Sequence, residues 1–363
     1  MTQLETLIQT LCPNGVHWSS VNDLIKQMIV HTVSASIKLK RNDYLTEGAT
    51  PIISQEEEFI SGYTNVTDKN IREREYVCFG DHSEHIKYVD FAFVQGADGL
   101  KIMYCNQDVL SAKYFYYAVS NFYKKHCNYE RHFKYLQELQ IPLPPLAVQS
   151  EIVRILDKFT LYKSELAAEL AARLQQYEYY RDKLLTFDDT VKRVKLGEVA
   201  TIKNGKGYKD LGNGSIPVYG SGGIMTYVDT AVYDKPSVLI PRKGSLSNLF
   251  YLETPFWNVD TIFYTIINNE VIIPKFLFYL LQNMHLETLN KAGGVPSLTQ
   301  EILNKISIPL PPLSEQERIV SILDRFDKLC NDISEGLPAE IEARKKQYEY
   351  YRDKLLTFKE KDA

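Results

Sequence analysis

The sequence contains a long segment that occurs twice. Residues 141–146 read IPLPPL, and residues 308–313 repeat these letters 167 positions further along. Residues 149–159, QSEIVRILDKF, return at the same offset as QERIVSILDRF, and YEYYRDKLLTF at 177–187 recurs unchanged at 348–358. Solenoid repeats have periods of about 20–50 residues, so a repeat of this length indicates a duplicated domain. The 363 residues are therefore predicted to be one unit of about 180 residues written twice.

Two dissimilar segments alternate with the two copies. The predicted boundaries are 1–140 and 188–307 for the dissimilar segments, and 141–187 and 308–363 for the repeated ones. Each dissimilar segment has short β-like runs separated by glycine turns, followed by one helical pattern. Equivalent places in this order are held by Asp98 and Asp260, and by Tyr117 and Tyr279. We therefore expect an α+β chain with two mixed α/β domains that share a fold and differ in surface.

The repeated segments are predicted to be long helices. The prolines of IPLPPL end any preceding element, and apolar residues then recur at steps of three, four and seven, as in a coiled-coil seam. Such a stripe also fits a helix packed on its own domain, but its double occurrence favours antiparallel pairing of the two helices about a pseudo-two-fold axis. The seam residues are Ile152, Leu156, Phe159, Leu166, Leu170, Leu174, Ile319, Leu323, Phe326, Ile333, Leu337 and Ile341.

Two local features distinguish the helices from each other. Gly336 and Pro338 predict a kink or a break in the second copy. The first copy carries a tetrapeptide rhythm, SELA, AELA and ARLQ, over residues 164–175. Four helical residues add about 6 Å of rise, so we interpret these helices as rulers whose length can change in one-turn steps.

Composition excludes several classes of protein. The formal charge is −4, with −3 in residues 1–140 and +1 in residues 188–307, so a strongly basic nucleic-acid binder acting alone is not expected. The apolar runs are far shorter than the roughly 18 residues of a membrane span. Five cysteines without a CxxC pair fit reduced thiols, and the polar N-terminal residues do not resemble a signal peptide. We expect a cytoplasmic protein.

Motifs for catalysis are missing from the sequence. The glycine stretches fit neither the phosphate loop nor the dinucleotide fingerprint, and the Asn-Pro-Pro-aromatic motif of amino-methyltransferases does not occur. Cys78, His82 and His85 could together bind a metal, but no second cluster completes four ligands, which favours a polar surface loop. A fused nuclease or methyltransferase is therefore a weak alternative.

What remains is binding chemistry, concentrated in loops. Lysine and arginine neutralise phosphates, and polar side chains read base edges in the major groove. Each of these residues taken singly also fits a solvated surface position. Taken together they favour DNA binding, because they lie in loops of two related domains. The DNA-binding candidates are Lys38, Lys40, Arg41, Gln55, His82, His85, Arg131, His132 and Lys134 in the first segment, and Lys203, Asn204, Lys206, Tyr208, Lys209, Arg242, Lys243, Ser245, Ser247 and Asn248 in the second.

The chain resembles the specificity subunits of type I restriction–modification systems. The matching features are a segment ending in IPLPPL, a helix with the pattern Q-x-x-I-V-x-I-L-D-x-F, and QYEYYRDKLLTF, all present twice. The second dissimilar segment is typical, with LGEVATIKNGK and GGVPSLTQEILNKISIPLPPL, whereas the first carries YERHFKYLQELQIPLPPL in place of the GGVPSLTQ run. The contacts of the first domain are therefore harder to place.

This resemblance implies a function and partners. Each dissimilar domain is expected to read one half of a bipartite, asymmetric site in double-stranded DNA, and the paired helices to set the unread spacer. The chain itself is expected to be non-catalytic and to bind no cofactor or metal. It would scaffold two methyltransferase subunits and recruit restriction subunits, which would use S-adenosylmethionine, ATP and Mg²⁺. An orphan or phase-variable recognition protein without active partners remains an alternative. A coiled-coil scaffold that does not bind nucleic acid would explain the helices, but not why two related domains carry such different loops.

Overall fold

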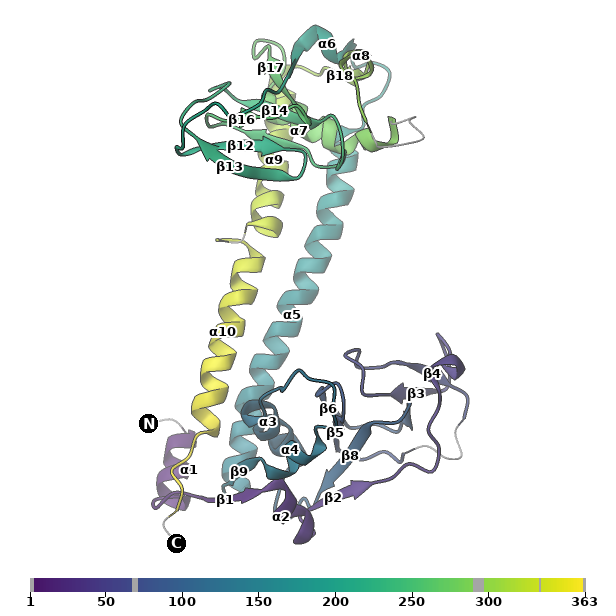
Figure 1. Cartoon of the computed structure of the whole chain (residues 1–363), viewed down its shortest axis with the longest axis vertical. Coiled ribbons are helices and arrows are strands. Elements are labelled where there is room, and N and C mark those ends of the chain that lie inside the picture. The colour runs from purple at the N-terminus through teal and green to yellow at the C-terminus, as the bar shows by residue number, and fades with distance from the viewer. Residues whose placement is uncertain (1–2, 67–70, 290–296, 333, 362–363) are drawn as a thin grey trace. The chain divides into compact units, whose positions relative to one another are not determined.

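The computed structural model describes residues 3–66, 71–289, 297–332 and 334–361, and the chain divides into two compact units. Unit 1 comprises Met1–Leu166 and Ile341–Ala363, and unit 2 comprises Ala167–Glu340. Each unit therefore combines one dissimilar segment with parts of the repeated helices, so the units cross the boundaries expected from the sequence. Figure 1 shows the elements of both units.

Unit 1 begins with a short helix and contains two small sheets and one strand pair. Its elements are α1 (Gln3–Leu11), β1 (His17–Ser20), α2 (Val21–Lys26), β2 (Val30–Val33), η1 (Arg41–Asp43), β3 (Thr50–Ile53), β4 (Gly62–Thr64), β5 (Tyr76–Gly80), β6 (Ile86–Val89), β7 (Val94–Gln95), β8 (Leu100–Cys105), α3 (Ala112–Phe122), α4 (Phe133–Glu138), β9 (Gln140–Leu143) and the first part of α5 (Leu146–Leu185). The strand orders are β2-β8-β5-β6, β4-β3-β7 and β1-β9.

Unit 2 repeats the order of strands and covering helices of unit 1, without counterparts of α1 and η1 among the residues that the structure describes. Its elements are β10 (Arg193–Lys195), α6 (Leu196–Val199), β11 (Ala200–Asn204), β12 (Ile216–Gly220), β13 (Gly223–Val228), β14 (Ser237–Pro241), β15 (Phe250–Leu252), β16 (Trp257–Asn258), β17 (Ile262–Ile267), α7 (Pro274–Asn283), η2 (Leu286–Leu289), α8 (Gln300–Asn304), β18 (Ser307–Pro309), α9 (Leu313–Asn331) and α10 (Leu337–Leu356), whose second part belongs to unit 1. The strand orders are β11-β17-β14-β15, β13-β12-β16 and β10-β18.

The two units share one topology, which confirms the shared fold predicted for the dissimilar segments. Strands β2, β8, β5 and β6 correspond to β11, β17, β14 and β15, and in both units these pairs are antiparallel. The parallel pairs are β3 with β7 and β12 with β16, and they also correspond. Two sequences with different loops thus build the same sheets.

Local sequence explains the central strands and the covering helices. β5 (YVCFG) and β14 (SVLIP) are buried at every position, as expected for short apolar runs inside a sheet. α3 is capped by Ser111, whose hydroxyl accepts a hydrogen bond from the Tyr114 amide. α7 starts at Pro274, a residue favoured in the first helical turn. Both helices bury an aromatic face in the core of their own unit.

The repeated segments form the predicted helices. α5 is continuous over 40 residues. The second copy is broken between α9 and α10, where the Gly336 amide donates a 3.0 Å hydrogen bond to the Asp332 carbonyl, and the predicted break is confirmed. Both copies of YEYYRDKLL therefore lie at the end of a helix.

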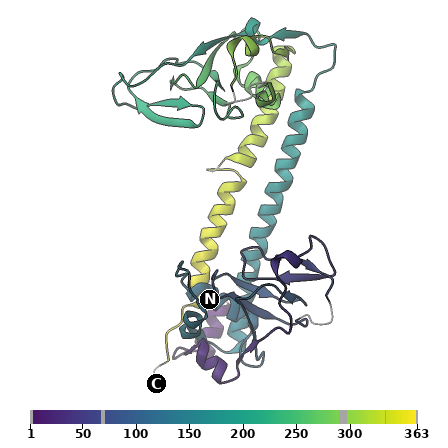
Figure 2. The ribbon, with the colours of Figure 1, turned by 45° about the vertical axis from the view of Figure 1, so that its right-hand side comes forward.

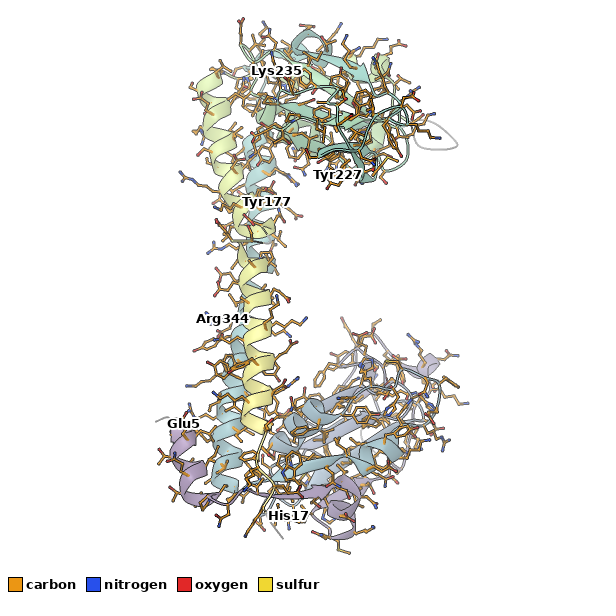
Figure 3. All side chains as sticks on the ribbon, turned by 60° about the vertical axis from the view of Figure 1, so that its left-hand side comes forward. Glu5, His17, Tyr177, Tyr227, Lys235 and Arg344 are labelled. Carbon is orange, nitrogen blue, oxygen red and sulfur yellow. The ribbon has the colours of Figure 1, made fainter. Side chains whose placement is uncertain are left out.

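Within each unit, two repeated helices run antiparallel and meet through equivalent aromatic residues. In unit 1, Phe159 of α5 stacks on Tyr351 of α10, with ring centroids 5.5 Å apart. In unit 2, the ring of Phe326 of α9 lies 5.8 Å from that of Tyr180 and 6.2 Å from that of Tyr177 of α5. Tyr177 is labelled in Figure 3. The sequence repeat makes Phe159 equivalent to Phe326 and Tyr180 to Tyr351, so the same contact occurs twice.

Only part of the predicted seam is a closely packed interface. Ile152 and Leu156 are fully buried in the core of unit 1, as are Ile319 and Leu323 in unit 2, and each core also contains residues of the domain and of the second helix. The middle of the seam is looser: Leu166, Leu170 and Ile341 are half-buried. Leu337 is buried, and Leu174, at 36% exposed, is the most exposed of the described seam residues. Ile333 lies outside the described residues.

Unit 1 is completed by both ends of the chain (Figures 1 and 2). The Val16 amide donates to the Lys359 carbonyl at 2.9 Å, and the Lys361 amide donates to the Val16 carbonyl at 2.9 Å. Gly15 has φ +92°, and a Cβ there would lie 2.4 Å from the Lys359 carbonyl oxygen, so the contact requires glycine. In unit 2 the equivalent helix end and strand are joined by the chain itself, because residues 186–192 connect α5 to β10.

Candidate nucleic-acid interface

Each domain is fixed to its helix by a buried glutamine. In unit 1, Gln149 Oε1 accepts from the Ser111 amide at 2.9 Å, and its Nε2 donates to the carbonyls of Pro144 and Val109 at 2.8 and 3.0 Å. In unit 2, Gln316 Oε1 accepts from the Ile273 amide at 2.8 Å, and its Nε2 donates to Pro311 and Val271 at 2.9 and 3.1 Å. These bonds tie the start of the covering helix to the IPLPPL strand and to the long helix.

A second duplicated contact lies further along each helix. The hydroxyl of Tyr117 donates to Asp157 at 2.7 Å, and that of Tyr279 donates to Asp324 at 2.7 Å. Lys113 and Lys275 complete the two clusters, at 2.8 and 3.0 Å from the same carboxylates. The predicted equivalence of Tyr117 and Tyr279 is confirmed, and the framework that presents the loops is the same in both units.

In unit 1 the structure brings several predicted site residues together. Gln55 follows β3, and its Oε1 accepts from the amide of His82, in the turn between β5 and β6, at 3.2 Å. The Gln55 side chain also closes against Gly99 in the turn before β8, where φ is +103°. Three loops that are distant in the sequence thus form one surface.

Basic side chains border this surface. Lys38 donates to Asp98 at 2.8 Å, and this hydrogen bond, with the charges of Lys38 and Arg131, lowers the pKa of the Asp98 carboxyl. Arg41 lies 3.3 Å from Glu56, next to Gln55 in the sequence, and Lys40 is exposed beside it. Ion pairs this exposed contribute little to stability, so their lysine and arginine members remain free to exchange partners for phosphates.

The structure corrects the assignment of His132. Its ring is completely buried, with Nδ1 3.1 Å from the Asp81 carbonyl and Nε2 2.7 Å from Asn128 Oδ1. It cannot contact DNA from this position and acts in packing instead. Lys134 is exposed on α4 and bonded to Glu130 at 2.7 Å. Burial and the nearby Lys125 lower the pKa of His85, so this histidine is neutral at pH 7.

In unit 2, two predicted groups emerge at one end of the sheet. Strands β11 and β14 flank β17, and Asn204 and Ile240 both pair with Phe263. The loop after β11 carries Lys206 and Lys209, and the loop after β14 carries Lys243, Ser245 and Ser247; all five side chains are exposed, as are those of Lys203 and Asn204. The sheet therefore brings together two loops that are about 40 positions apart in sequence.

The turn between β12 and β13 joins this surface. The Asn248 side-chain amide donates to the Ser221 carbonyl at 3.1 Å, and the Ser221 amide donates to the Thr261 hydroxyl at 3.3 Å. Gly205 packs on β16, where a Cβ would lie 2.0 Å from the Val259 carbonyl oxygen. Its role is therefore close packing rather than an approach to phosphate. Tyr208 is half-buried against a small core of three valines, Val218, Val228 and Val259. Arg242 is half-buried near Phe263.

Sequence reasoning missed the exposed apolar residues of both surfaces. Ile224, Met225 and Tyr227 of β13 are exposed, and Tyr129 of the first domain is 95% exposed. Periodicity could not find them, because residues on short strands and in loops give no extended pattern. A large aromatic residue directly followed by charged residues, as in CNYERH, was the available signal for Tyr129.

The proposed metal alternative finds no support in the geometry. Cys78 is fully buried, and burial raises the pKa of its thiol to about 12. Among the residues that the structure describes, no three histidine, cysteine, aspartate or glutamate side chains are placed to hold a metal ion. In the same described part of the chain, no helix is both long and apolar enough to cross a membrane.

Comparison with known proteins identifies a family. The family described as "Type I restriction modification DNA specificity domain" matches residues 29–176 and again residues 188–343. A type I restriction enzyme specificity subunit of Escherichia coli is 32% identical over 401 residues, covering 99% of this chain and 98% of that one.

Solved structures give the same picture of the fold. The S subunit of a type I restriction–modification system from M. genitalium has a TM-score of 0.63 at 19% identity, covering 94% of this chain and 96% of that one. A chain from a structure concerned with complex assembly of the type I system has a TM-score of 0.58 at 16% identity, covering 95% and 98%.

Proposed function

The chain belongs to the family of type I restriction–modification DNA specificity proteins, and we propose that it is the DNA-recognition subunit of such a system. It reads a bipartite, asymmetric site in double-stranded DNA, with one domain for each half-site. The candidate surface of unit 1 reads one half, and that of unit 2 reads the other.

One observation carries this proposal: the framework is duplicated and the loops are not. The Gln149 and Gln316 bonds, and the Tyr117 and Tyr279 bonds, hold both domains in the same way. The exposed loops differ in length and composition, so the same framework presents two chemistries. A protein that read two identical half-sites would need no such difference.

The identical helix ends support two copies of one partner. Tyr179 in unit 2 and Tyr350 in unit 1 are each 61% exposed, and each packs edge-on against its neighbouring tyrosine, at 5.4 and 5.3 Å. Tyr179 and Tyr180 also line an open groove with Arg173. Exposed tyrosines are common anchors in protein interfaces. Because the face occurs twice with the same sequence, its occupant is a methyltransferase subunit present in two copies.

The chemistry belongs to those partners. The chain is a non-catalytic subunit, and S-adenosylmethionine, ATP and Mg²⁺ are bound by the methyltransferase and restriction subunits in the cytoplasm. The near-neutral charge of this chain fits such a division, because the partners add positive surface around the DNA.

A domain exchange tests the proposal. Residues 188–307 are replaced by the corresponding segment of another family member, and the complete system is expressed in cells whose methylome is then sequenced. One half of the methylated motif should change and the other should stay. A change in both halves, or a motif that is not bipartite in the parent system, would contradict the proposed function.

A further inference from the structure

The loop between α3 and α4 of unit 1 is basic and exposed. Residues 124–131 read KKHCNYER, with three basic residues and one acidic residue. Tyr129 projects from this loop with 95% of its surface exposed, more than any other large apolar side chain described. An aromatic ring this exposed costs solvation free energy unless a partner covers it.

A buried carboxylate holds the loop in place. Glu84, in the turn between β5 and β6, is 3% exposed, and its oxygens accept hydrogen bonds from the His126 amide at 2.9 and 3.0 Å and the Cys127 amide at 2.9 Å. The Tyr123 hydroxyl donates a further bond at 2.7 Å. Burial alone would raise the pKa of Glu84, but these bonds lower it to about 2, so the carboxylate is charged at neutral pH.

Contacts with the residues that follow the loop fix the rest of its conformation. The buried His132 ring lies 2.7 Å from Asn128 Oδ1, and His126 stacks on Tyr135 with centroids 4.0 Å apart. Tyr135 donates to Glu130 at 2.9 Å. Glu84 and Cys127 both have a left-handed backbone conformation, with φ of +57° and +56°. Residues other than glycine adopt this conformation mainly where surrounding contacts stabilise it.

The held loop extends the candidate surface of unit 1. The Tyr129 ring stacks on His82 with centroids 5.6 Å apart and an interplanar angle of 18°. The same His82 contacts Gln55 through its amide and the Glu130 carbonyl through Nδ1 at 3.0 Å. Tyr129 is therefore the outermost member of a stack that begins in the folded turn.

Resting on the proposed function, we propose that loop 124–131 determines the specificity of the first half-site. Tyr129 contacts a base, Lys124, Lys125 and Arg131 contact phosphates, and Glu84 is a positioning residue. This loop occupies the place in the first domain where the sequence departs from the typical pattern, which explains why its contacts could not be placed from the sequence.

Three physical arguments favour DNA as the occupant. Positive side chains that precede and follow Tyr129 in the loop provide the charge that binds phosphates beside a groove. A tyrosine provides a large contact area with few rotatable bonds, so little entropy is lost when it is ordered. Because the backbone is already fixed by Glu84 and His132, the loop does not have to be ordered on binding, and the affinity is higher than for a mobile loop of the same sequence.

The test uses the complex with its methyltransferase partners. The wild-type methylome supplies the motif, and the half that survives exchange of residues 188–307 belongs to the first domain. Duplexes with single base changes in each half are then compared for binding and methylation. Tyr129→Ala should reduce discrimination at one or two positions of the first half by roughly 5- to 100-fold and leave the second half unchanged.

Two further variants separate the roles. Lys124→Ala combined with Lys125→Ala should weaken binding to all sequences alike and lower the salt slope by about 2, one for each lost phosphate contact. Glu84→Gln should lose discrimination in the first half only, which a general loss of folding would not produce. Tyr227→Ala, which removes an exposed tyrosine of the second domain (Figure 3), is the matched control and should leave the first half unchanged.

The outcomes are distinct. If Tyr129→Ala leaves discrimination in both halves unchanged while the parent complex still methylates a bipartite motif, the inference about the loop is wrong and the proposed function stands. If the parent complex shows no bipartite motif, the proposed function itself fails. Since Tyr129 is almost fully exposed, its truncation does not endanger folding, and the test does not depend on the Glu84 variant.

Discussion

Replacing Gln149 or Gln316 by leucine is expected to destabilise one unit and spare the other. Leucine has a similar size, so the substitution mainly removes hydrogen bonds. Each glutamine side chain accepts a hydrogen bond from one backbone amide and donates hydrogen bonds to two carbonyls. The bonds to the carbonyls of Pro144 and Pro311 are buried. The two sites are equivalent in the repeat, so the two variants should have equal effects.

The expected magnitude follows from the groups left without partners. A fully buried polar group without a hydrogen bond costs about 1–3 kcal/mol. Two of the three partners of each glutamine are only partly buried and can bind water. The sum is about 3 kcal/mol for each unit. With a urea dependence of about 2–3 kcal/mol per molar for a domain of this size, the unfolding midpoint should fall by about 1 M.

The two tryptophans make the assay specific to each unit. Trp18 lies in β1 of unit 1 and Trp257 in β16 of unit 2, and the chain has no others. In a Trp257→Phe background, fluorescence follows unit 1 and should detect Gln149→Leu. In a Trp18→Phe background it follows unit 2 and should detect Gln316→Leu.

The same fluorescence assay provides a control for the two glutamine variants and the result that would contradict the prediction. Gln175→Leu replaces an exposed glutamine of α5 and should shift neither midpoint. A shift below about 0.3 M for either buried glutamine would refute the reasoning about unpaired backbone groups. Equal shifts of both tryptophan signals by a single variant would show that the units do not unfold separately.

Three further predictions concern the helices and the first domain. Inserting one tetrapeptide within residues 168–174 should lengthen the unread spacer by about 1–2 base pairs, from about 6 Å of helix against about 3.4 Å per base pair; methylome sequencing that showed an altered half-site would contradict the ruler. Tyr179→Ala and Tyr350→Ala should each release one methyltransferase subunit in light scattering, and loss of both copies by one variant would rule out independent sites. The pKa of Glu84, about 2, lies below the usual value of about 4.3 for an unfolded chain. The ionised carboxylate therefore adds at most about 3 kcal/mol to the free energy of unfolding, which is present above pH 4.3 and lost as the pH falls towards 2. Glu84→Gln should flatten this dependence of stability on acid, and an unchanged midpoint of acid unfolding would contradict the prediction.

The repeat made much of the fold predictable. The equivalence of Tyr117 with Tyr279 could be read from their matching places in the order of elements, and it appears in the structure as matching hydrogen bonds to Asp157 and Asp324 of the repeated helices. Gly336 and Pro338 gave the helix break because they act through the local backbone. Periodicity gave the seam positions but not how deeply each is buried, which ranges from fully buried at Ile152 to 36% exposed at Leu174.

The candidate site was predictable only in part. Loops rich in lysine and arginine could be found, and the sheets bring Lys206 near Lys243 in unit 2 and Gln55 near His82 in unit 1. His132 was misassigned because a histidine beside an arginine looks the same whether its ring is buried or exposed. Tyr129 was overlooked because its exposure depends on Glu84, a residue 45 positions earlier.

The sequence by itself determined the duplication, the two helices, the shared fold of the dissimilar segments and the family resemblance, because each depends on local pattern or on comparison of the chain with itself. The tertiary structure decided how these parts are shared between two units, so that the ends of the chain complete unit 1 and α5 and α10 each contribute to both units. It also decided which polar side chains are structural and which are free to bind. These outcomes depend on contacts between residues that are far apart in the chain. Burial determines the free energy of a polar group, and burial follows from those contacts rather than from the residue type.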